Sequence, residues 1–169
     1  MYKIFIIPLL VILPAFAELD QGYVVYPRQV IQCLKNRKAS DLKVLTDNNP
    51  YYLRGDFDGD NKPDYALEVR AKSGGTGVLI CTGKGLLFLL GAGIGEKKFS
   101  DDEEDSFLAP HWEVLSQRDV EELRAWRGNV PYPIPYFKGE AIAMIWEDGT
   151  SLIYWDGKQF RWAGCERTD

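Results

Sequence analysis

The segment RGDFDGDNKPDY, residues 54–65, contains four closely spaced acids: Asp56, Asp58, Asp60 and Asp64. They occupy positions 1, 3, 5 and 9 of a loop, a spacing that lets a tight turn direct successive carboxylate oxygens toward one centre. Calcium takes six to eight oxygen ligands at about 2.3–2.6 Å, and carboxylates this close repel one another unless a cation neutralises them. The spacing therefore predicts a calcium site at these aspartates, completed by the main-chain carbonyl of Lys62 at position 7.

The same residues resemble a known calcium loop. GDFDGDNKPDYA is similar to the loop of FG-GAP and VCBS-type repeats, found in integrin-like propellers and many exported bacterial proteins, with the pattern DxDGDGxxD before an apolar strand. The resemblance implies that the four aspartates are side-chain ligands and that Lys62 supplies a carbonyl. The second glycine of the pattern is Asn61 here, and asparagine tolerates the left-handed conformation better than most residues. The sequence contains no second copy, so the resemblance implies one loop hairpin in a small domain rather than a propeller.

Two other structures share this spacing of acids. An EF-hand loop has glutamate at position 12, which is Leu67 here, and its flanks are helical rather than β-rich. A turn whose aspartate and asparagine side chains cap their own backbone amides needs no ion. The sequence disfavours the EF-hand and leaves the ion-free turn as the alternative to calcium binding.

Short apolar runs separated by turn residues surround the loop and continue to the C-terminus. Asp148-Gly149 and Asp156-Gly157 are typical hairpin turns between such runs. The runs predict about six or seven antiparallel strands. They cover residues 51–55, 64–71, 77–83, 86–93, 140–146, 151–155 and 159–164. Period-two alternation places Tyr154 and Trp155 on opposite faces and Phe160 and Trp162 on the same face, and we expect one of the two faces to fill the core.

Two segments have helical rather than β periodicity. Residues 28–37 place their apolar side chains on one side, and residues 117–126 follow a capping box formed by Ser116 and Asp119. We therefore expect an α+β fold, mainly an antiparallel sheet or small sandwich, with two short helices and one calcium-loop hairpin. Residues 22–27 are expected to be a short strand or extended lead, and residues 40–50 are ambiguous between helix and strand.

The N-terminal residues predict export. Lys3 precedes an apolar run, and Ala15-Phe16-Ala17 has the small-residue spacing of a signal peptidase site, so residues 1–17 are interpreted as a signal peptide. The remainder, residues 18–169, is long enough for a single β-rich domain, located in the periplasm or secreted. Its net charge of −6, the −5 of the whole chain without Lys3, argues against a nucleic-acid partner. No membrane span is expected after processing.

The three cysteines, Cys33, Cys81 and Cys165, are too far apart in sequence for a zinc knuckle or a CxxC site. In an exported protein two of them are expected to pair, and three pairings are open. We expect Cys33 to pair with Cys81, because Cys33 lies on the apolar side of the expected helix and Cys81 within a β run.

Signatures of catalysis are missing from the sequence. His111 is the single histidine, and no GxSxG, HExxH or phosphate-binding glycine motif occurs. We therefore expect an exported, calcium-stabilised binding or interaction module without catalysis, whose partner is an envelope or secreted protein or a glycan. One alternative is an inhibitor or immunity-type protein that presents the acidic run 101–105 to an envelope hydrolase. The other is a carboxylate-based hydrolase, because acids are plentiful.

Overall fold

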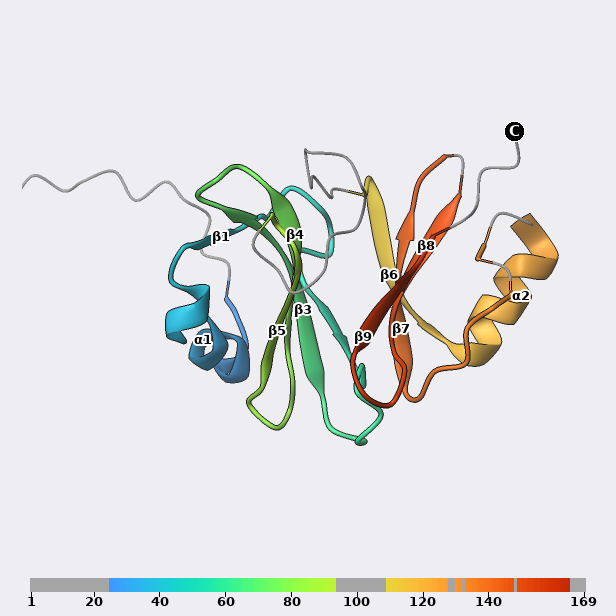
Figure 1. The fold of residues 1–169 in the computed structure, drawn as a ribbon, viewed down its shortest axis with the longest axis horizontal. Helices are drawn as coiled ribbons and strands as arrows, with labels where there is room; N and C mark the ends of the chain where they lie inside the picture. The colour runs from blue at the N-terminus through green and yellow to red at the C-terminus, as the bar shows by residue number, and fades with distance from the viewer. Residues whose placement is uncertain (1–24, 94–108, 128–129, 132, 148, 165–169) are drawn as a thin grey trace, which may run out of the picture.

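The computed structural model describes residues 25–93, 109–127, 130–131, 133–147 and 149–164. In this part of the chain two antiparallel sheets pack face to face, and one helix lies on the outer side of each sheet (Figure 1). The expected α+β class with a small β-sandwich is confirmed.

The first sheet is built from the N-terminal half. Its strands follow the order β1-β3-β4-β5, and β2 also pairs with β3. Their bounds are β1 Leu42–Val44, β2 Leu53–Gly55, β3 Asp64–Ala71, β4 Thr76–Cys81 and β5 Leu87–Gly91. Helix α1 (Arg28–Leu34) and the short 3-10 helix η1 (Arg37–Ala39) precede it, so the ambiguous residues 40–50 contribute a strand.

The second sheet is a four-stranded meander in the order β6-β7-β8-β9. Its strands are β6 His111–Ser116, β7 Glu140–Ile145, β8 Thr150–Trp155 and β9 Phe160–Ala163. Helix α2 (Gln117–Arg127) follows β6 directly. The described residues thus form nine strands rather than six or seven, because β1 and β6 join those that the apolar runs predict.

Three apolar layers hold the fold together. The central strands have both faces buried, and alternate residues enter different layers: Ile142 and Met144 of β7 face the first sheet, whereas Ala141 and Ala143 face α2. The layer between the sheets includes Phe57 of the aspartate loop, whose side chain is 1% exposed. Full burial of such a ring stabilises the folded state by about 2–3 kcal/mol, so the loop is anchored in the core.

Both helices differ slightly from the expected ranges. α1 ends at Leu34, and Asn36 starts η1 by accepting a hydrogen bond from the Lys38 amide at 3.0 Å. The capping box before α2 is confirmed, since Ser116 N donates to Asp119 Oδ2 at 2.8 Å and Asp119 N donates to Ser116 Oγ at 3.2 Å.

The expected disulfide is confirmed: Cys33 of α1 is bonded to Cys81 of β4. It ties the helix to the outer face of the first sheet, beside Val30, Leu67 and Leu79. The third cysteine, Cys165, lies outside the described residues.

Several expectations concern residues that the structure does not describe. These are the signal peptide at 1–17, the start of the extended lead at 22–24 and the acidic run at 101–105. The described remainder of the lead, residues 25–27, forms no strand. Neither described helix has the length and apolar character needed to cross a membrane.

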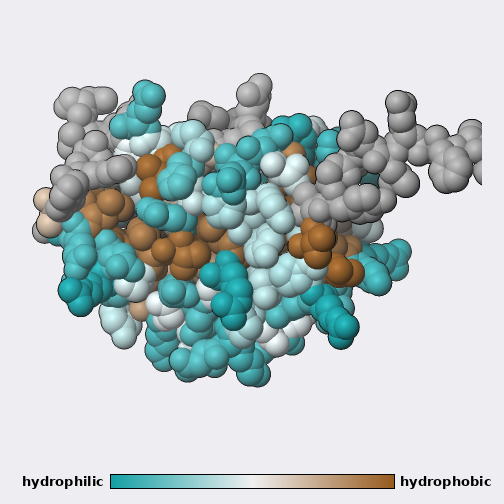
Figure 2. All heavy atoms as spheres, turned by 180° about the vertical axis from the view of Figure 1, so that it is seen from behind, coloured by the Kyte–Doolittle hydropathy of each residue, from teal (hydrophilic) through white to brown (hydrophobic). Residues whose placement is uncertain are grey.

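The predicted faces of the C-terminal aromatic residues are confirmed. Tyr154 packs with the α2 layer, whereas Trp155, Phe160 and Trp162 pack with the layer between the sheets. Elsewhere, hydrophobic side chains gather in separate groups among hydrophilic ones on the face shown in Figure 2. Among the residues that the structure describes, the exposed large hydrophobic ones are Val25, Ile31, Leu86 and Tyr136. They come from separate parts of the chain, and we assign no binding surface to them.

Candidate metal centre

The aspartate loop connects β2 to β3 and closes this hairpin where Gly55 pairs with Asp64. Two residues of the loop have positive φ, Gly59 at +70° and Asn61 at +61°. Asn61 is the residue that replaces the second glycine of the calcium-loop pattern, and it adopts the left-handed conformation, which asparagine tolerates better than most residues. The chain can therefore coil tightly around its own aspartate side chains.

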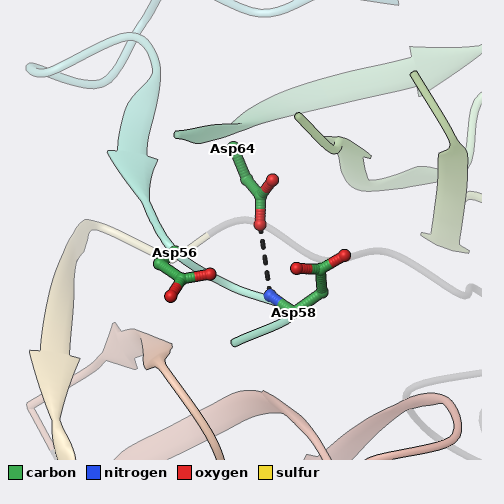
Figure 3. Close-up of side chains that lie close together, drawn as sticks. All are labelled: Asp56, Asp58 and Asp64. Atoms are coloured by element: carbon green, nitrogen blue, oxygen red, sulfur yellow. Dashed lines mark hydrogen bonds between the residues drawn. The ribbon is translucent and has the colours of Figure 1, made fainter. Parts of the chain in front are cut away.

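Three of the four predicted acids converge (Figure 3). One carboxylate oxygen from each of Asp56, Asp58 and Asp64 lies within 4.8 Å of the others, a separation that oxygens around one hard cation can have. Asp60 is not part of this group, because its carboxylate turns to the Lys62 amide and to Lys84.

Backbone amides hold two of the converging carboxylates. Asp64 accepts from Phe57 N at 2.8 Å and Asp58 N at 3.1 Å through Oδ2, and from Gly83 N at 2.7 Å through Oδ1. Asp56 accepts from the amides of Asp60 and Asn61, both at 2.9 Å. These bonds are those of an aspartate-capped turn. Both oxygens of Asp56 and Oδ1 of Asp64 accept one bond each and retain a second lone pair, whereas Oδ2 of Asp64 already accepts two bonds.

Asp58 differs from the other acids. Its side chain is 7% exposed, and its Oδ1 has no hydrogen-bond partner among the described residues. The other oxygen, Oδ2, lies 3.1 Å from Nζ of Lys84. A buried carboxylate oxygen without a partner is costly in free energy, and a cation or a water molecule bound to it would lower that cost.

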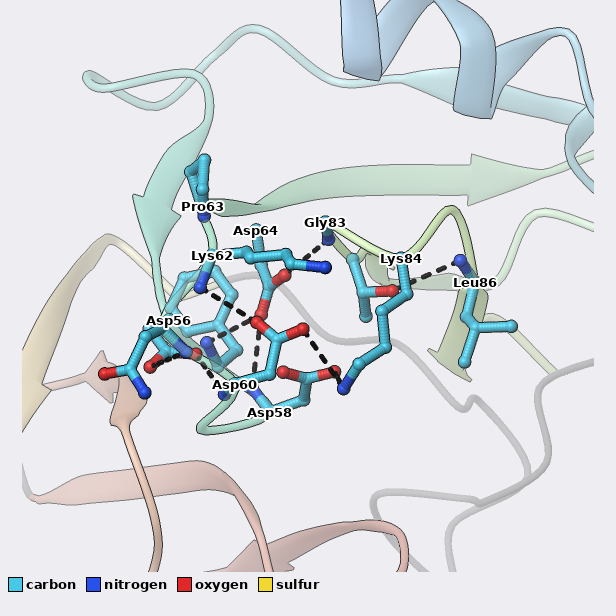
Figure 4. Close-up of polar contacts among 12 residues, drawn as sticks. Asp56, Asp58, Asp60, Lys62, Pro63, Asp64, Gly83, Lys84 and Leu86 are labelled. Carbon is cyan, nitrogen blue, oxygen red and sulfur yellow. Dashed lines mark hydrogen bonds and ion pairs between the residues drawn. The ribbon is translucent and has the colours of Figure 1, made fainter.

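Lys84 reaches the loop from the turn between β4 and β5 (Figure 4). Its Nζ is also 3.1 Å from Oδ2 of Asp60, an ionic contact without the alignment of a hydrogen bond. Burial acts to raise the pKa of Asp60, but the Lys84 ammonium and the Lys62 amide outweigh it, so the pKa lies below its ordinary value of 3.8. The contacts with Asp60 and Asp58 raise the pKa of Lys84 in turn.

The pKa of Asp64 is shifted in the opposite direction to that of Asp60. Burial raises the pKa of Asp64 above 3.8, and the three amides that donate to it reduce this shift without cancelling it. The neighbouring charge of Asp58 adds to the increase. An ionised Asp64 is therefore incompletely compensated by the protein groups around it.

The second sheet also contacts the loop. Asp56 N donates to Glu140 Oε2, and Glu140 N donates to the Asp56 carbonyl, both at 2.8 Å. Gly139 precedes this contact with φ +72°, and a Cβ there would collide with the carbonyl oxygen of Asp56. The loop is thus docked onto the start of β7 by contacts that require a glycine.

Solvent reaches the Asp56 side of the loop through a shallow depression. The depression is lined by Arg54, Gly55, Asp56, Asn61, Lys62, Pro63 and Glu140. Of the three converging acids its lining includes Asp56, so a dissolved ion can approach that carboxylate without opening the core. The expected role of the Lys62 carbonyl as a ligand stays a prediction.

Sequence reasoning missed the contacts of Gly83, Lys84 and Glu140. Lys84-Gly85 is recognisable as a turn between two apolar runs, and the register of β3 with β4 places that turn beside Asp64, since Tyr65 pairs with Cys81. The contact of Glu140 depends on how the two sheets pack, for which the sequence offers no signal.

A second buried acid lies away from the loop. Glu68 of β3 points between the sheets, is 2% exposed and accepts from Asn48 Nδ2 through both oxygens, at 3.0 and 2.9 Å. Burial raises the pKa of Glu68 from 4.5 to about 7. His111, in contrast, is exposed at the start of β6.

Comparisons of the chain with protein-family models, curated proteins and solved structures find no match. The similarity to FG-GAP and VCBS-type loops therefore stays a prediction. The case for a cation depends on the geometry of Asp56, Asp58 and Asp64 and on the unpartnered oxygen of Asp58.

Proposed function

We propose that this protein is an exported binding or interaction module whose fold is stabilised by one calcium ion in the aspartate loop. The observation that carries the proposal is the convergence of the carboxylates of Asp56, Asp58 and Asp64, together with a buried oxygen of Asp58, Oδ1, that has no described partner. A divalent cation there would offset the repulsion between Asp58 and Asp64.

Calcium fits this donor set better than magnesium. The donors are hard carboxylate oxygens on a loop of Asp, Asn and Gly, and waters from the adjacent depression complete a flexible shell. Magnesium requires a nearly ideal octahedron at about 2.1 Å and keeps most of its waters. We therefore expect calcium to bind more tightly than magnesium.

The deciding experiment is calorimetric titration of calcium into the chelator-treated protein, together with thermal unfolding with and without the ion. Extracellular modules commonly bind calcium with a Kd of about 0.1–1 mM, and ion at one hundred times Kd adds about 2.7 kcal/mol of stability. Asp58→Ala should abolish both the heat of binding and the thermal shift.

Asp41→Ala is the matched control. It removes the same charge from an exposed site, where Asp41 pairs with Lys72, and should leave calcium binding unchanged. A wild-type protein with no heat and no thermal shift in millimolar calcium would exclude the proposal and leave the ion-free turn as the explanation of the loop.

The exported location and the partner class are parts of the same proposal. Support for export comes from residues 1–17, and support for a binding role comes from the missing catalytic motifs. Processing at Ala17 would be checked by the mass of the mature protein from an envelope or culture fraction. The unprocessed mass in that fraction would exclude cleavage there.

A further inference from the structure

Lys84 lies at the tip of a rigid turn. Gly85 N donates to the Thr82 carbonyl at 2.8 Å, and Thr82 N donates to the Leu86 carbonyl at 2.9 Å. Gly83 N fixes the same turn to Asp64. The backbone of Lys84 is therefore held beside the aspartate loop. Its side chain is 47% exposed, so its ammonium group can either contact the loop or extend into solvent.

The ammonium group contacts the acids that solvent scarcely reaches. Nζ is 3.1 Å from Oδ2 of Asp58 and 3.1 Å from Oδ2 of Asp60, whose side chains are 7% and 11% exposed. No other ion pair of these two acids occurs in the described part of the chain. Lys84 is thus their principal positive partner (Figure 4).

One ammonium cannot satisfy the whole cluster. It carries a single charge, it touches two of the four aspartates, and it leaves Oδ1 of Asp58 without a partner. A divalent ion among Asp56, Asp58 and Asp64 would share the carboxylate of Asp58 with Nζ, and the two cations would repel each other. The flexible four-carbon stem of lysine allows the ammonium to withdraw into water.

We propose that Lys84 is a built-in counter-ion that competes with the divalent cation for Asp58 and Asp60. In the ion-free protein the Lys84 ammonium group reduces the repulsion between these acids. When the ion binds, the Lys84 side chain moves away into solvent, and the loss of its contacts with the acids weakens the affinity for the ion. The inference rests on the proposed function, since it assigns the regulation of the same site.

The test compares calcium affinity in wild type, Lys84→Gln and Lys84→Arg by calorimetry after removal of bound metal. Lys84→Gln removes the competing charge and should bind calcium about tenfold more tightly. Lys84→Arg keeps the charge and should restore the weaker affinity. Lys72→Gln removes a lysine that pairs with Asp41, and should bind as wild type does.

Thermal unfolding supplies a second readout. Without calcium, Lys84→Gln should unfold at a lower temperature than wild type, because the acids lose their counter-ion. In saturating calcium the two proteins should unfold at nearly the same temperature, so the calcium-induced shift is larger in the variant.

The outcomes separate the two proposals. Calcium binding by wild type, with equal or weaker affinity in Lys84→Gln, would overturn the counter-ion role and leave the calcium site standing. Measurable binding by wild type, with tighter binding by Lys84→Gln, would support both proposals. No binding by either protein would overturn the calcium site, and the role of Lys84 with it.

Discussion

Asp56 and Glu140 hold each other through two hydrogen bonds that run in opposite directions. The Asp56 amide donates to the Glu140 carboxylate, and the Glu140 amide donates to the Asp56 carbonyl, each at 2.8 Å. Asp56 begins the aspartate loop of the first sheet, and Glu140 begins β7 of the second. Order in the loop is thereby coupled to the packing of the two sheets.

Glu140→Ala should weaken the contact between the aspartate loop and β7. The variant loses the acceptor of the Asp56 amide, and loss of such a partly buried bond to a charged group costs about 1–2 kcal/mol. We expect the free energy of unfolding in urea, measured in chelator, to fall by that amount. Glu140→Gln keeps an acceptor oxygen and should lose less. Equal stability of Glu140→Ala and wild type would show that the main-chain bond alone docks the loop.

Glu68 should make stability depend on pH. Because burial raises its pKa from 4.5 to about 7, the folded protein binds this proton more tightly than the unfolded chain. The free energy of unfolding should therefore decrease as pH rises from 4.5 to 7. Each pKa unit corresponds to about 1.4 kcal/mol, so this effect amounts to about 3 kcal/mol. Urea unfolding at pH 5 and pH 8 measures it.

Glu68→Gln is the control for that titration. Glutamine keeps an oxygen for the Asn48 amide but cannot ionise, so the variant should lose this part of the pH dependence. The aspartates titrate in both proteins and cancel in the comparison. Parallel pH profiles for the two proteins would show that Glu68 has an ordinary pKa.

Much of the fold follows from local signals in the sequence. The hairpin turns, the capping box of Ser116 and Asp119, and the left-handed Asn61 each depend on a few neighbouring residues. β6 escaped prediction because charged and polar residues interrupt it, and along its length only Trp112 and Leu115 are buried.

The site could be predicted only in part, because local sequence signals predict contacts within the loop but not contacts with residues from other parts of the chain. The spacing of Asp56, Asp58 and Asp64 predicts their convergence, since one short loop carries them all. The side chain of Lys84 reaches that loop from the turn between β4 and β5, and the carboxylate of Glu140 reaches it from the start of β7. Their positions depend on strand register and on the packing of the sheets. The alternation of apolar and polar residues predicts that strands form, but not how they pair or pack.

The disulfide should contribute strongly to stability. Cys33 and Cys81 are 48 residues apart, and closing a loop of this length restricts the unfolded chain by about 4 kcal/mol in the chain-entropy model. A Cys33→Ala/Cys81→Ala double variant should therefore unfold at a markedly lower temperature. Reductant should lower the unfolding temperature of wild type and leave the double variant unchanged. Equal unfolding temperatures of wild type and double variant would contradict the prediction.

Variants of Asp64 and Asp58 should distinguish residues that stabilise the folded loop from residues that bind the ion. Asp64 is fully buried and accepts from the amides of Phe57, Asp58 and Gly83, so Asp64→Ala leaves buried donors without a partner. We expect a loss of about 3 kcal/mol in urea unfolding, with chelator present. Among the described residues the side chain of Asp58 bonds only to Lys84, so Asp58→Ala should be much less destabilising in chelator.

The response of the two variants to calcium should also differ. Asp58→Ala in chelator should retain nearly the stability of ion-free wild type, yet gain nothing from added calcium, because it has lost a ligand and kept the turn. Asp64→Ala should be unstable in both conditions, because the amides that shape the loop have lost their acceptor whether or not an ion is present. If instead both variants matched wild type in chelator and differed from it only in calcium, Asp64 would be a ligand alone, and its bonds to Phe57, Asp58 and Gly83 would contribute nothing to the fold.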